Sequence, residues 1–328
     1  MAKVYLSKEI EKIIDKMDFS KLGEKVGIKV HFGERGCVTY TNPEIVKKVY
    51  DRLISLGKGA ALVECNVLYR GSRTIKQEHI KVAKEHGFGF APIDILDGEK
   101  GEEFIEVEGA KLGKGIEKYD SLIILTHFKG HITAGFGGAF KNMGMGFGSR
   151  AGKLDMHSNL TPFVNKNACV GCSECIKNCN ANAISLVNEK AEIDKGKCEG
   201  CTMCIAVCPQ SAISLPWGEE KEGELDKRIV NYGKSVINLF KDKIIYINIL
   251  ENITKDCDCF GIVQKPIIED IGILLSEDPV AIDKASYDLV NEKSENKFQQ
   301  ISNANDLQTE YASELSLGEK EYEMEKLD

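Results

Sequence analysis

The middle of the chain carries one cysteine pattern twice, within residues 169–209. The first copy reads Cys169-Val-Gly-Cys172-Ser-Glu-Cys175-Ile-Lys-Asn-Cys179, and the second reads Cys198-Glu-Gly-Cys201-Thr-Met-Cys204-Ile-Ala-Val-Cys208. The copies are offset by 29 residues and together use eight of the 12 cysteines. The likeness continues past the cysteines, because Ala-Ile-Ser-Leu follows each copy. This stretch therefore predicts a compact unit of two similar halves, with thiols placed to hold metal.

The spacing within each copy, Cys-x2-Cys-x2-Cys-x3-Cys, resembles that of bacterial two-cluster ferredoxins. In that arrangement three cysteines of each copy bind one [4Fe-4S] cluster, and the fourth crosses to the other cluster. The expected ligands are Cys169, Cys172, Cys175 and Cys208 for one cluster, and Cys198, Cys201, Cys204 and Cys179 for the other. The pattern thus predicts electron transfer.

Two other uses of closely spaced cysteines fit this pattern less well. Structural zinc sites use two Cys-x2-Cys pairs separated by a longer spacer. Disulfides suit secreted proteins, and residues 1–5 show no apolar signal core. One position departs from the ferredoxin pattern, because Asn180 stands where proline normally follows the fourth cysteine. We expect an altered turn there and no loss of a cluster.

The sequence before the cysteines alternates between predicted strands and helices. Strands are expected at residues 26–32, 60–67, 90–96 and 121–126. One helix should begin at Asn42 and Pro43, with Asn42 as its N-cap, and another at Ser72, ending near His86. This rhythm is typical of a largely parallel sheet with crossover helices.

The same rhythm resumes after the cysteines. A helix is expected at residues 225–240, strands at 243–250 and 270–276, and a helix after Asp278-Pro279. The tail from Leu307 is acidic and predicts a solvated helix. The fold class is therefore α/β, with an α+β ferredoxin-like insert at residues 164–216 between body segments 1–163 and 217–328. Whether the body is one sheet or two lobes stays open.

Composition limits the classes of partner. The chain of 328 residues has a formal net charge of −8 and a pI of about 5.5, which gives no electrostatic footprint for nucleic acid. No apolar run has the length that a membrane span needs. We therefore expect a cytoplasmic protein, in a reducing and anaerobic setting that suits exposed clusters, with a redox protein or a small molecule as its partner.

A second group of chemical side chains follows the strand at residues 121–126. The stretch from Thr126 to His157 holds His127, His131 and His157 together with Lys141 and many glycines. Parallel sheets bind ligands at the carboxyl ends of their strands. Two interpretations stay open: a metal site that uses the histidines, or an anion pocket in which glycine-rich backbone and lysines bind phosphate or carboxylate. The glycines could also simply form tight turns.

The segment Cys257-Asp-Cys259 follows the apolar strand at residues 243–250. Two thiolates there could bind a metal, attack a substrate or form a redox pair, and the flanking acids argue against an ordinary core segment. Cys37, after an earlier strand, could face the same cleft, whereas Cys65 lies within an apolar strand and is expected in the core. Asp278 is expected as a helix cap that could line the cleft, and Asp283 as a helix-surface residue.

Several segments together resemble the DUF362 family of iron–sulfur proteins. They are residues 63–73, the histidine and glycine stretch at 126–146, Asp256-Cys-Asp-Cys259, and residues 270–283. The resemblance covers nearly the whole chain and implies an α/β domain joined to two [4Fe-4S] clusters. The histidine loop is also similar to that of nickel-dependent lactate racemases, from which we carry over neither nickel nor racemisation.

Three functions agree with these patterns. In the first, a ferredoxin-fused oxidoreductase passes electrons from the clusters to a centre lined by His127, His131, Lys141, Cys257 and Cys259, with an extra metal held by some of these residues and His157. In the second, the protein is an electron carrier without a reaction of its own, whose body docks a partner. In the third, it assembles metals or clusters and uses Cys257 and Cys259 as transfer ligands.

Overall fold

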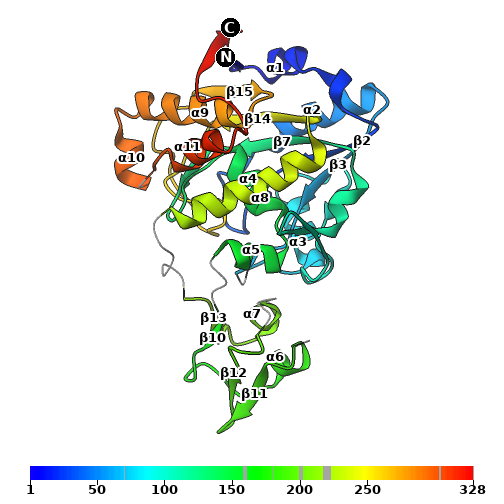
Figure 1. The fold of residues 1–328 in the computed structure, drawn as a ribbon, viewed down its shortest axis with the longest axis vertical. Coiled ribbons are helices and arrows are strands. Elements are labelled where there is room, and N and C mark those ends of the chain that lie inside the picture. The colour runs from blue at the N-terminus through cyan, green and yellow to red at the C-terminus, as the bar shows by residue number, and fades with distance from the viewer. Residues whose placement is uncertain are drawn as a thin grey trace.

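The body of the protein is built on one mixed sheet of eight strands (Figure 1). The computed structural model describes residues 1–69, 71–157, 161–179, 181–198, 202–216, 223–302 and 304–327. The strands lie in the order β16 (Tyr322–Lys326), β1 (Ala2–Ser7), β15 (Gly272–Ser276), β14 (Ile244–Leu250), β7 (Ser121–His127), β2 (Lys25–Lys29), β3 (Gly59–Glu64) and β4 (Ile93–Ile95). Only β15 runs antiparallel to its neighbours in this sheet. The predicted α/β fold with a mostly parallel sheet is confirmed, and the body is a single sheet.

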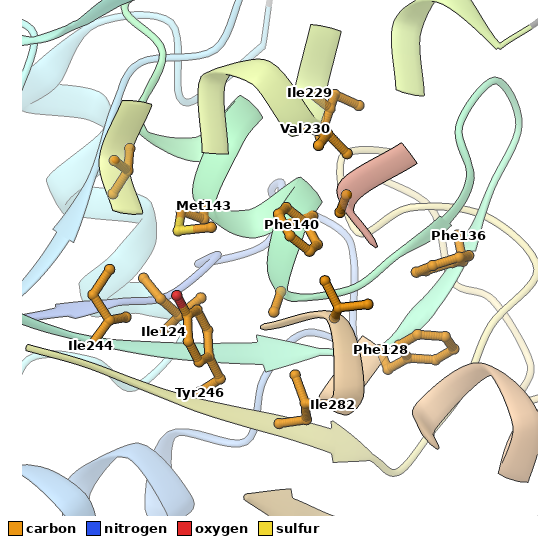
Figure 2. Close-up of a cluster of buried hydrophobic side chains, with 14 of the residues drawn as sticks. Ile124, Phe128, Phe136, Phe140, Met143, Ile229, Val230, Ile244, Tyr246 and Ile282 are labelled. Atoms are coloured by element: carbon orange, nitrogen blue, oxygen red, sulfur yellow. The ribbon is translucent and has the colours of Figure 1, made fainter. Parts of the chain in front are cut away.

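Helices cover both faces of the sheet. One face carries α1 (Ile10–Lys16), α2 (Pro43–Ser55) and α3 (Lys76–Glu85). The other carries α4 (Ala139–Phe147), α8 (Glu224–Phe240), α9 (Pro279–Lys293), α10 (Lys297–Ser302) and α11 (Leu307–Glu314). Successive residues of the fully buried β7 point to opposite faces, so Ile124 packs with the second group of helices and Ile123 with the first. Figure 2 shows Phe140 and Met143 of α4 packed between α8 and the sheet.

Helix starts follow the sequence signals at two of three positions. The Asn42 side chain accepts from the backbone N–H of Glu44 and caps α2, and Asp278 accepts from Val280 and Ala281 and caps α9. Both caps were expected. Ser72 does not cap α3, which begins at Lys76 without a side-chain cap. The Ser72 hydroxyl instead accepts from Arg35 Nη1 at 3.2 Å.

The C-terminal tail differs from the predicted solvated helix. Helix α11 ends at Glu314, and residues 322–326 then pair in parallel with β1 as β16. Tyr322 and Met324 alternate with exposed glutamates, which is the period of a half-buried strand. β16 thereby covers a sheet edge that would otherwise expose unpaired backbone groups.

The cysteine-bearing segment, defined here as residues 163–214, projects from the body (Figure 1). It contains β10 (Phe163–Val164), α6 (Glu174–Lys177), β11 (Ile184–Val187), β12 (Lys190–Ile193), α7 (Met203–Val207) and β13 (Ile213–Ser214). β10 pairs with β13 and β11 with β12, both antiparallel. Strands therefore form at both Ala-Ile-Ser-Leu repeats, as expected. Asn180 and Cys201 lie outside the described residues.

Short elements complete the fold. They are η1 (Phe19–Lys21), the pair β5 (Phe104–Val107) and β6 (Ala110–Gly113), η2 (Lys114–Lys118), the pair β8 (Lys129–His131) and β9 (Gly135–Gly137), and α5 (Arg150–Met156). Among the helices of the described ranges, none is long and apolar enough to cross a membrane.

Candidate functional site

A cavity of about 540 Å³ lies at the carboxyl ends of the central strands. β3 and β4 follow β2 on one side, whereas β7 and β14 lie on its other side, so the strand order reverses between β2 and β7. Such a reversal point is where open α/β sheets bind their ligands. The polar and sulfur-bearing residues that line the cavity are Lys29, His31, Glu64, Cys65, Tyr69, Arg73, Thr126, Lys129, His131, Thr133, Lys141, Asn142, Met145, Lys153, His157, Cys257 and Cys259.

The Cys257-Asp258-Cys259 segment presents its two thiols to this cavity and turns its carboxylate the other way. Both cysteines line the cavity, whereas Asp258 is fully buried. One Asp258 oxygen, Oδ2, lies 2.8 Å from His127 Nδ1 and 3.1 Å from Lys129 Nζ. Burial alone would raise the pKa of Asp258, but His127 and Lys129 hold it below its usual range. The acids of this segment predicted a place outside the core, and the contacts of Asp258 with His127 and the Lys129 ammonium explain why it is inside.

His127 was expected to line the cleft, and it is not among the residues that line the cavity. Its Nδ1 faces Asp258, and its Nε2 lies 3.0 Å from the backbone oxygen of Glu251. Both ring nitrogens are therefore occupied in holding the loop that carries the two cysteines. The geometry gives His127 a positioning role.

The two sulfurs of the segment lie 2.8 Å apart. A hydrogen bond from Cys259 lowers the pKa of Cys257 well below its ordinary value, and Lys141 and Lys129 add to this effect against the opposing effect of burial. The same hydrogen bond, together with burial, raises the pKa of Cys259. Lys141 Nζ lies 3.7 Å from Cys257 Sγ. The arrangement favours a thiolate on Cys257 beside a thiol on Cys259.

Arg73 is a cavity residue that sequence reasoning gave no role. Its side chain has no exposure, and its Nη2 donates to the Tyr69 hydroxyl at 2.7 Å. Its Nε and Nη1 make no hydrogen bond with the described residues, and the carboxylates of Glu34 and Glu64 stand off at 3.6 and 4.0 Å. Unmet donors on a buried guanidinium call for an acceptor-rich ligand.

Two histidines line the cavity with one ring nitrogen fixed by the backbone. His131 Nδ1 accepts from the amides of Thr133 and Ala134, at 3.3 and 3.0 Å. His31 Nδ1 accepts from the amide of Gly33 at 3.2 Å. Burial lowers the pKa of both rings, and nearby lysines add to the effect, together with Arg73 at His31. Both rings are therefore neutral with the proton on Nε2.

In the described ranges, one group of His, Cys, Asp or Glu side chains brings three ligand atoms close enough to share a single metal ion. It consists of His31, Cys257 and Cys259, whose ligand atoms lie within 4.8 Å of one another. Of the extra site predicted from His127, His131, His157, Cys257 and Cys259, only the two cysteines belong to this group. Sequence reasoning missed His31, although it lies at the end of a predicted strand, because no second histidine stands at ligand spacing from it.

The glycine-rich stretch is not an open anion-binding loop over most of its length. Residues 139–147 form α4, and a Cβ on Gly144 would lie 2.2 Å from the backbone oxygen of Ile229 in α8. Asp283 accepts from the first amides of α4, those of Ala139 and Phe140, at 2.6 and 3.0 Å. Asp283 was expected on the helix surface and is instead fully buried. Burial raises its pKa to about 6.

The remaining predicted residues lie outside the cavity or at its edge. Cys37 is buried, lies 3.5 Å from the Thr39 hydroxyl, and does not line the cavity. Cys65 is fully buried, as expected for the core, with its sulfur at the cavity wall. Asp278 is not among the lining residues and acts as the α9 cap.

The cysteines of the cysteine-bearing segment fall into two groups. Cys169, Cys172, Cys175 and Cys208 line one small cavity. Cys179, Cys198 and Cys204 line a second. No disulfide joins cysteines in the described ranges. The fourth cysteine of each copy thus lies with the described members of the first three cysteines of the other copy.

The sequence duplication also appears in the backbone. Ser173 and Thr202, which are 29 residues apart, both have positive φ, at 64° and 55°. The Ala183 amide donates to Cys179 Sγ at 3.3 Å, and the Ala212 amide donates to Cys208 Sγ at 3.2 Å. Equivalent residues therefore direct equivalent amides at the sulfurs in both halves.

The second cysteine cavity lies against the body. Arg150 is fully buried, and its guanidinium donates to Thr202 Oγ1 at 3.1 Å, to the Thr202 carbonyl at 3.0 Å, and to the Leu68 carbonyl at 3.3 Å. Thr202 lines the second cysteine cavity, and Leu68 lines the large cavity at the strand ends. Arg150 therefore bridges the walls of two cavities.

The class of this protein is defined by an α/β fold with a cysteine pair in a cavity at the carboxyl ends of its strands. Residues 26–288 match the family described as "Domain of unknown function (DUF362)", and the chain belongs to that family. A comparison with curated proteins finds no match.

Two solved structures are similar at low identity. One is the lactate racemase apoprotein from Thermoanaerobacterium thermosaccharolyticum, at 14% identity and a TM-score of 0.43, with 89% of this chain and 58% of that chain covered. The other is a protein from Thermotoga maritima, at 12% identity and a TM-score of 0.41, with 87% and 57% covered. The chain thus spans less than two thirds of either protein.

Proposed function

We propose that this protein is an iron–sulfur oxidoreductase, in which two [4Fe-4S] clusters pass electrons to a substrate bound beside Cys257 and Cys259. The observation that carries the proposal is the separation of the seven described cluster cysteines into two cavities with exchanged fourth members. Two independent zinc sites would keep each copy's cysteines together, whereas crossed ligation is the arrangement of two-cluster ferredoxins. Cys201 completes the second set by its spacing.

The surroundings of the sulfurs support clusters over simple metal ions. Amide hydrogen bonds reach Cys169, Cys179 and Cys208. Hydrogen bonds to the sulfurs are one means by which proteins set the reduction potential of an iron–sulfur cluster. When bound, the clusters would supply single electrons at low potential. The same amides lower the pKa of Cys169, which favours the thiolate that binds iron.

The contacts of Arg150 support an order for the two clusters. The wall of the second cysteine cavity reaches the wall of the large cavity through Thr202, Arg150 and Leu68. Among the hydrogen bonds of the described residues, none joins the lining of the first cysteine cavity to the body in this way. We therefore assign the cluster of Cys179, Cys198, Cys201 and Cys204 as the one nearer the cleft.

The first experiment counts metal and sulfide in protein purified without oxygen. About eight iron and eight acid-labile sulfides per chain, with the EPR signals of reduced [4Fe-4S] clusters, are expected from two such clusters. Cys172→Ser should lose one cluster, and Cys37→Ser, which changes a buried cysteine outside both cavities, should keep both. Stoichiometric zinc without iron, or full iron in both Cys172→Ser and Cys204→Ser, would overturn the proposal.

A second candidate function is metal transfer, favoured by the group of His31, Cys257 and Cys259. Under it, the Cys257→Ser and Cys259→Ser variants would lose a metal that the cluster cysteines do not bind. A simple electron carrier would instead keep its full electron-transfer rate to any acceptor in these variants. Metal content and acceptor reduction, measured on the same preparations, separate the three functions.

A further inference from the structure

The cavity at the strand ends offers hydrogen-bond donors that no protein group uses. Lys141 Nζ meets only the Cys257 sulfur among the described contacts. Arg73 leaves Nε and Nη1 without a hydrogen bond. His131 has its Nδ1 occupied by two backbone amides, so its proton lies on Nε2. The three residues come from α4, from the loop between β3 and α3, and from β8, and all of them line one cavity.

Most acceptors within reach are already committed, although Glu34 Oε2 and Glu64 Oε2, at 3.6 and 4.0 Å from the Arg73 guanidinium, make no hydrogen bond with the described residues. Glu64, which lines the cavity, lies 2.9 Å from Lys29 Nζ, and Asp258 behind the wall is held by Lys129 and His127. The free donors of Lys141, Arg73 and His131 remain in excess of these oxygens, and a ligand that brings acceptors and negative charge satisfies them. The backbone amides at the start of α4 do not contribute donors to this site, because the first two already donate to the Asp283 carboxylate.

Part of the lining is apolar. Val67, Leu68, Ile132, Met145 and Phe260 line the same cavity as the donors. Its volume of about 540 Å³ lies within the range of small-molecule sites, about 300–1,000 Å³. An inorganic anion alone would leave this apolar wall uncovered.

We propose that the cavity binds the carboxylate or phosphate group of an organic anion through Lys141, Arg73 and the Nε2–H of His131, with the apolar part of the ligand against Leu68 and Met145. This inference gives the substrate class of the proposed oxidoreductase. The binding of the anion does not depend on that function, whereas its oxidation or reduction does. The bound oxyanion lies next to Cys257, because Lys141 contacts both. His131 acts as a donor in this site and is not a metal ligand.

Isothermal titration of the full chain without oxygen and at constant ionic strength tests the proposal. The probes are hexanoate, inorganic phosphate, and hexylammonium, which has the same apolar part as hexanoate and the opposite charge. Hexanoate should bind saturably and hexylammonium should not. Lys141→Met should weaken hexanoate binding at least tenfold, since it removes a charge-assisted hydrogen bond. Lys47→Met, which changes an exposed lysine paired with Asp51, should leave binding unchanged.

The histidine is tested by two variants of different chemistry. His131→Gln keeps an N–H donor and should weaken hexanoate binding less than His131→Leu does. Equal loss in both, unchanged affinity in Lys141→Met, or saturable binding of hexylammonium would overturn the proposal. If inorganic phosphate binds and hexanoate does not, the proposal that the ligand is an organic anion is wrong. The titration is repeated with the Cys172→Ser variant. Hexanoate binding that persists in this variant is independent of the cluster assignment, so the two proposals are tested separately.

Discussion

At the scale of the residue, Asp258 explains how two neighbouring cysteines can serve one cavity. The segment lies in a turn, which the Phe260 amide closes by donating to the Cys257 carbonyl oxygen at 3.1 Å. In this turn both cysteines line the cavity while Asp258 is fully buried. A buried carboxylate is stable there because Lys129 and His127 lie at hydrogen-bond distance. The polar residue that seemed to exclude this segment from the core is therefore the residue that fixes it there.

Asp258→Ala should destabilise the protein strongly. The change leaves Lys129 and His127 buried without their shared anion, and breaking a buried ion pair from one side costs about 3–5 kcal/mol. Chemical denaturation without oxygen measures the loss of unfolding free energy. The exposed Asp51→Ala gives the matched control and should change stability by less than about 0.5 kcal/mol. A loss in Asp258→Ala no larger than in that control would show that the pair contributes nothing.

Asp97 should make stability fall as pH rises. Burial raises the pKa of Asp97 to about 6 against the opposing effect of Lys153, and its Oδ2 has no hydrogen-bond partner among the described residues. Because the folded pKa exceeds the unfolded one, the stabilisation is complete below the unfolded pKa and is lost as pH rises through about 6. A shift of about two pKa units corresponds to about 3 kcal/mol.

The variant Asp97→Asn resembles the protonated carboxyl and should not show this loss. We expect the unfolding free energy of Asp97→Asn, relative to the wild type, to rise by about 3 kcal/mol between pH 4 and pH 7. Denaturation at several pH values checks it. A constant difference across the range would contradict the assignment of the titration to Asp97.

At the scale of the element, α4 shows what the sequence could not reveal about its glycines. A run of glycines before and within a helix looks like a flexible loop when neighbours are unknown. Gly144 is needed instead because α8 crosses α4 so closely that a Cβ would lie 2.2 Å from the Ile229 carbonyl oxygen. The close crossing places Lys141 and Met145 of the same helix at the cavity wall.

Gly144→Ala should therefore destabilise the protein although alanine favours helices. The clash with backbone has no flexible side chain to relieve it, and overpacking of this kind costs about 1–3 kcal/mol or more. Gly89→Ala is the control, because its Cβ would meet only the Lys84 side chain, at 3.7 Å. Thermal unfolding of both variants checks the difference. Equal melting temperatures would mean that the two helices separate without cost.

The elements with strong local signals were predicted and those that depend on distant partners were not. Asn42 and Pro43 begin α2 because a cap is a local interaction. β16 was taken for helix because its strand character depends on pairing with β1, about 320 residues earlier in the chain. β1 itself was not predicted, for the same reason.

At the scale of the whole molecule, the site was harder to predict than the fold. Cys257, Cys259, His131 and Lys141 were named from the sequence and line the cavity. His31 and Arg73 were missed, because the sheet brings them to the cavity from other strands and no spacing records that. His127 was placed in the cleft because it adjoins the right strand, but its ring turns toward Asp258.

The body should fold without the cysteine-bearing segment. Replacing residues 165–212 by a short glycine–serine turn keeps β10 and β13, which already pair with each other. We expect the variant to unfold cooperatively and to bind hexanoate, although Arg150 and Leu68 lose their partners on the segment. Circular dichroism and the titration described above check this. A variant that is unfolded in buffer would mean that the segment is part of the body's core.

The pairing of Phe163 with Ser214 and of Val164 with Ile213 has a consequence for the order of assembly. The chain leaves the body and returns to it at one point, so the segment between is a loop closed by the body. The entropy of closing a loop grows only with the logarithm of its length. A disordered loop of this size therefore costs about 2 kcal/mol more than a tight turn, which is small beside a typical domain stability of about 5–15 kcal/mol. We expect the α/β body to fold during or soon after synthesis. The protruding loop should become ordered only later, when the proposed clusters are inserted.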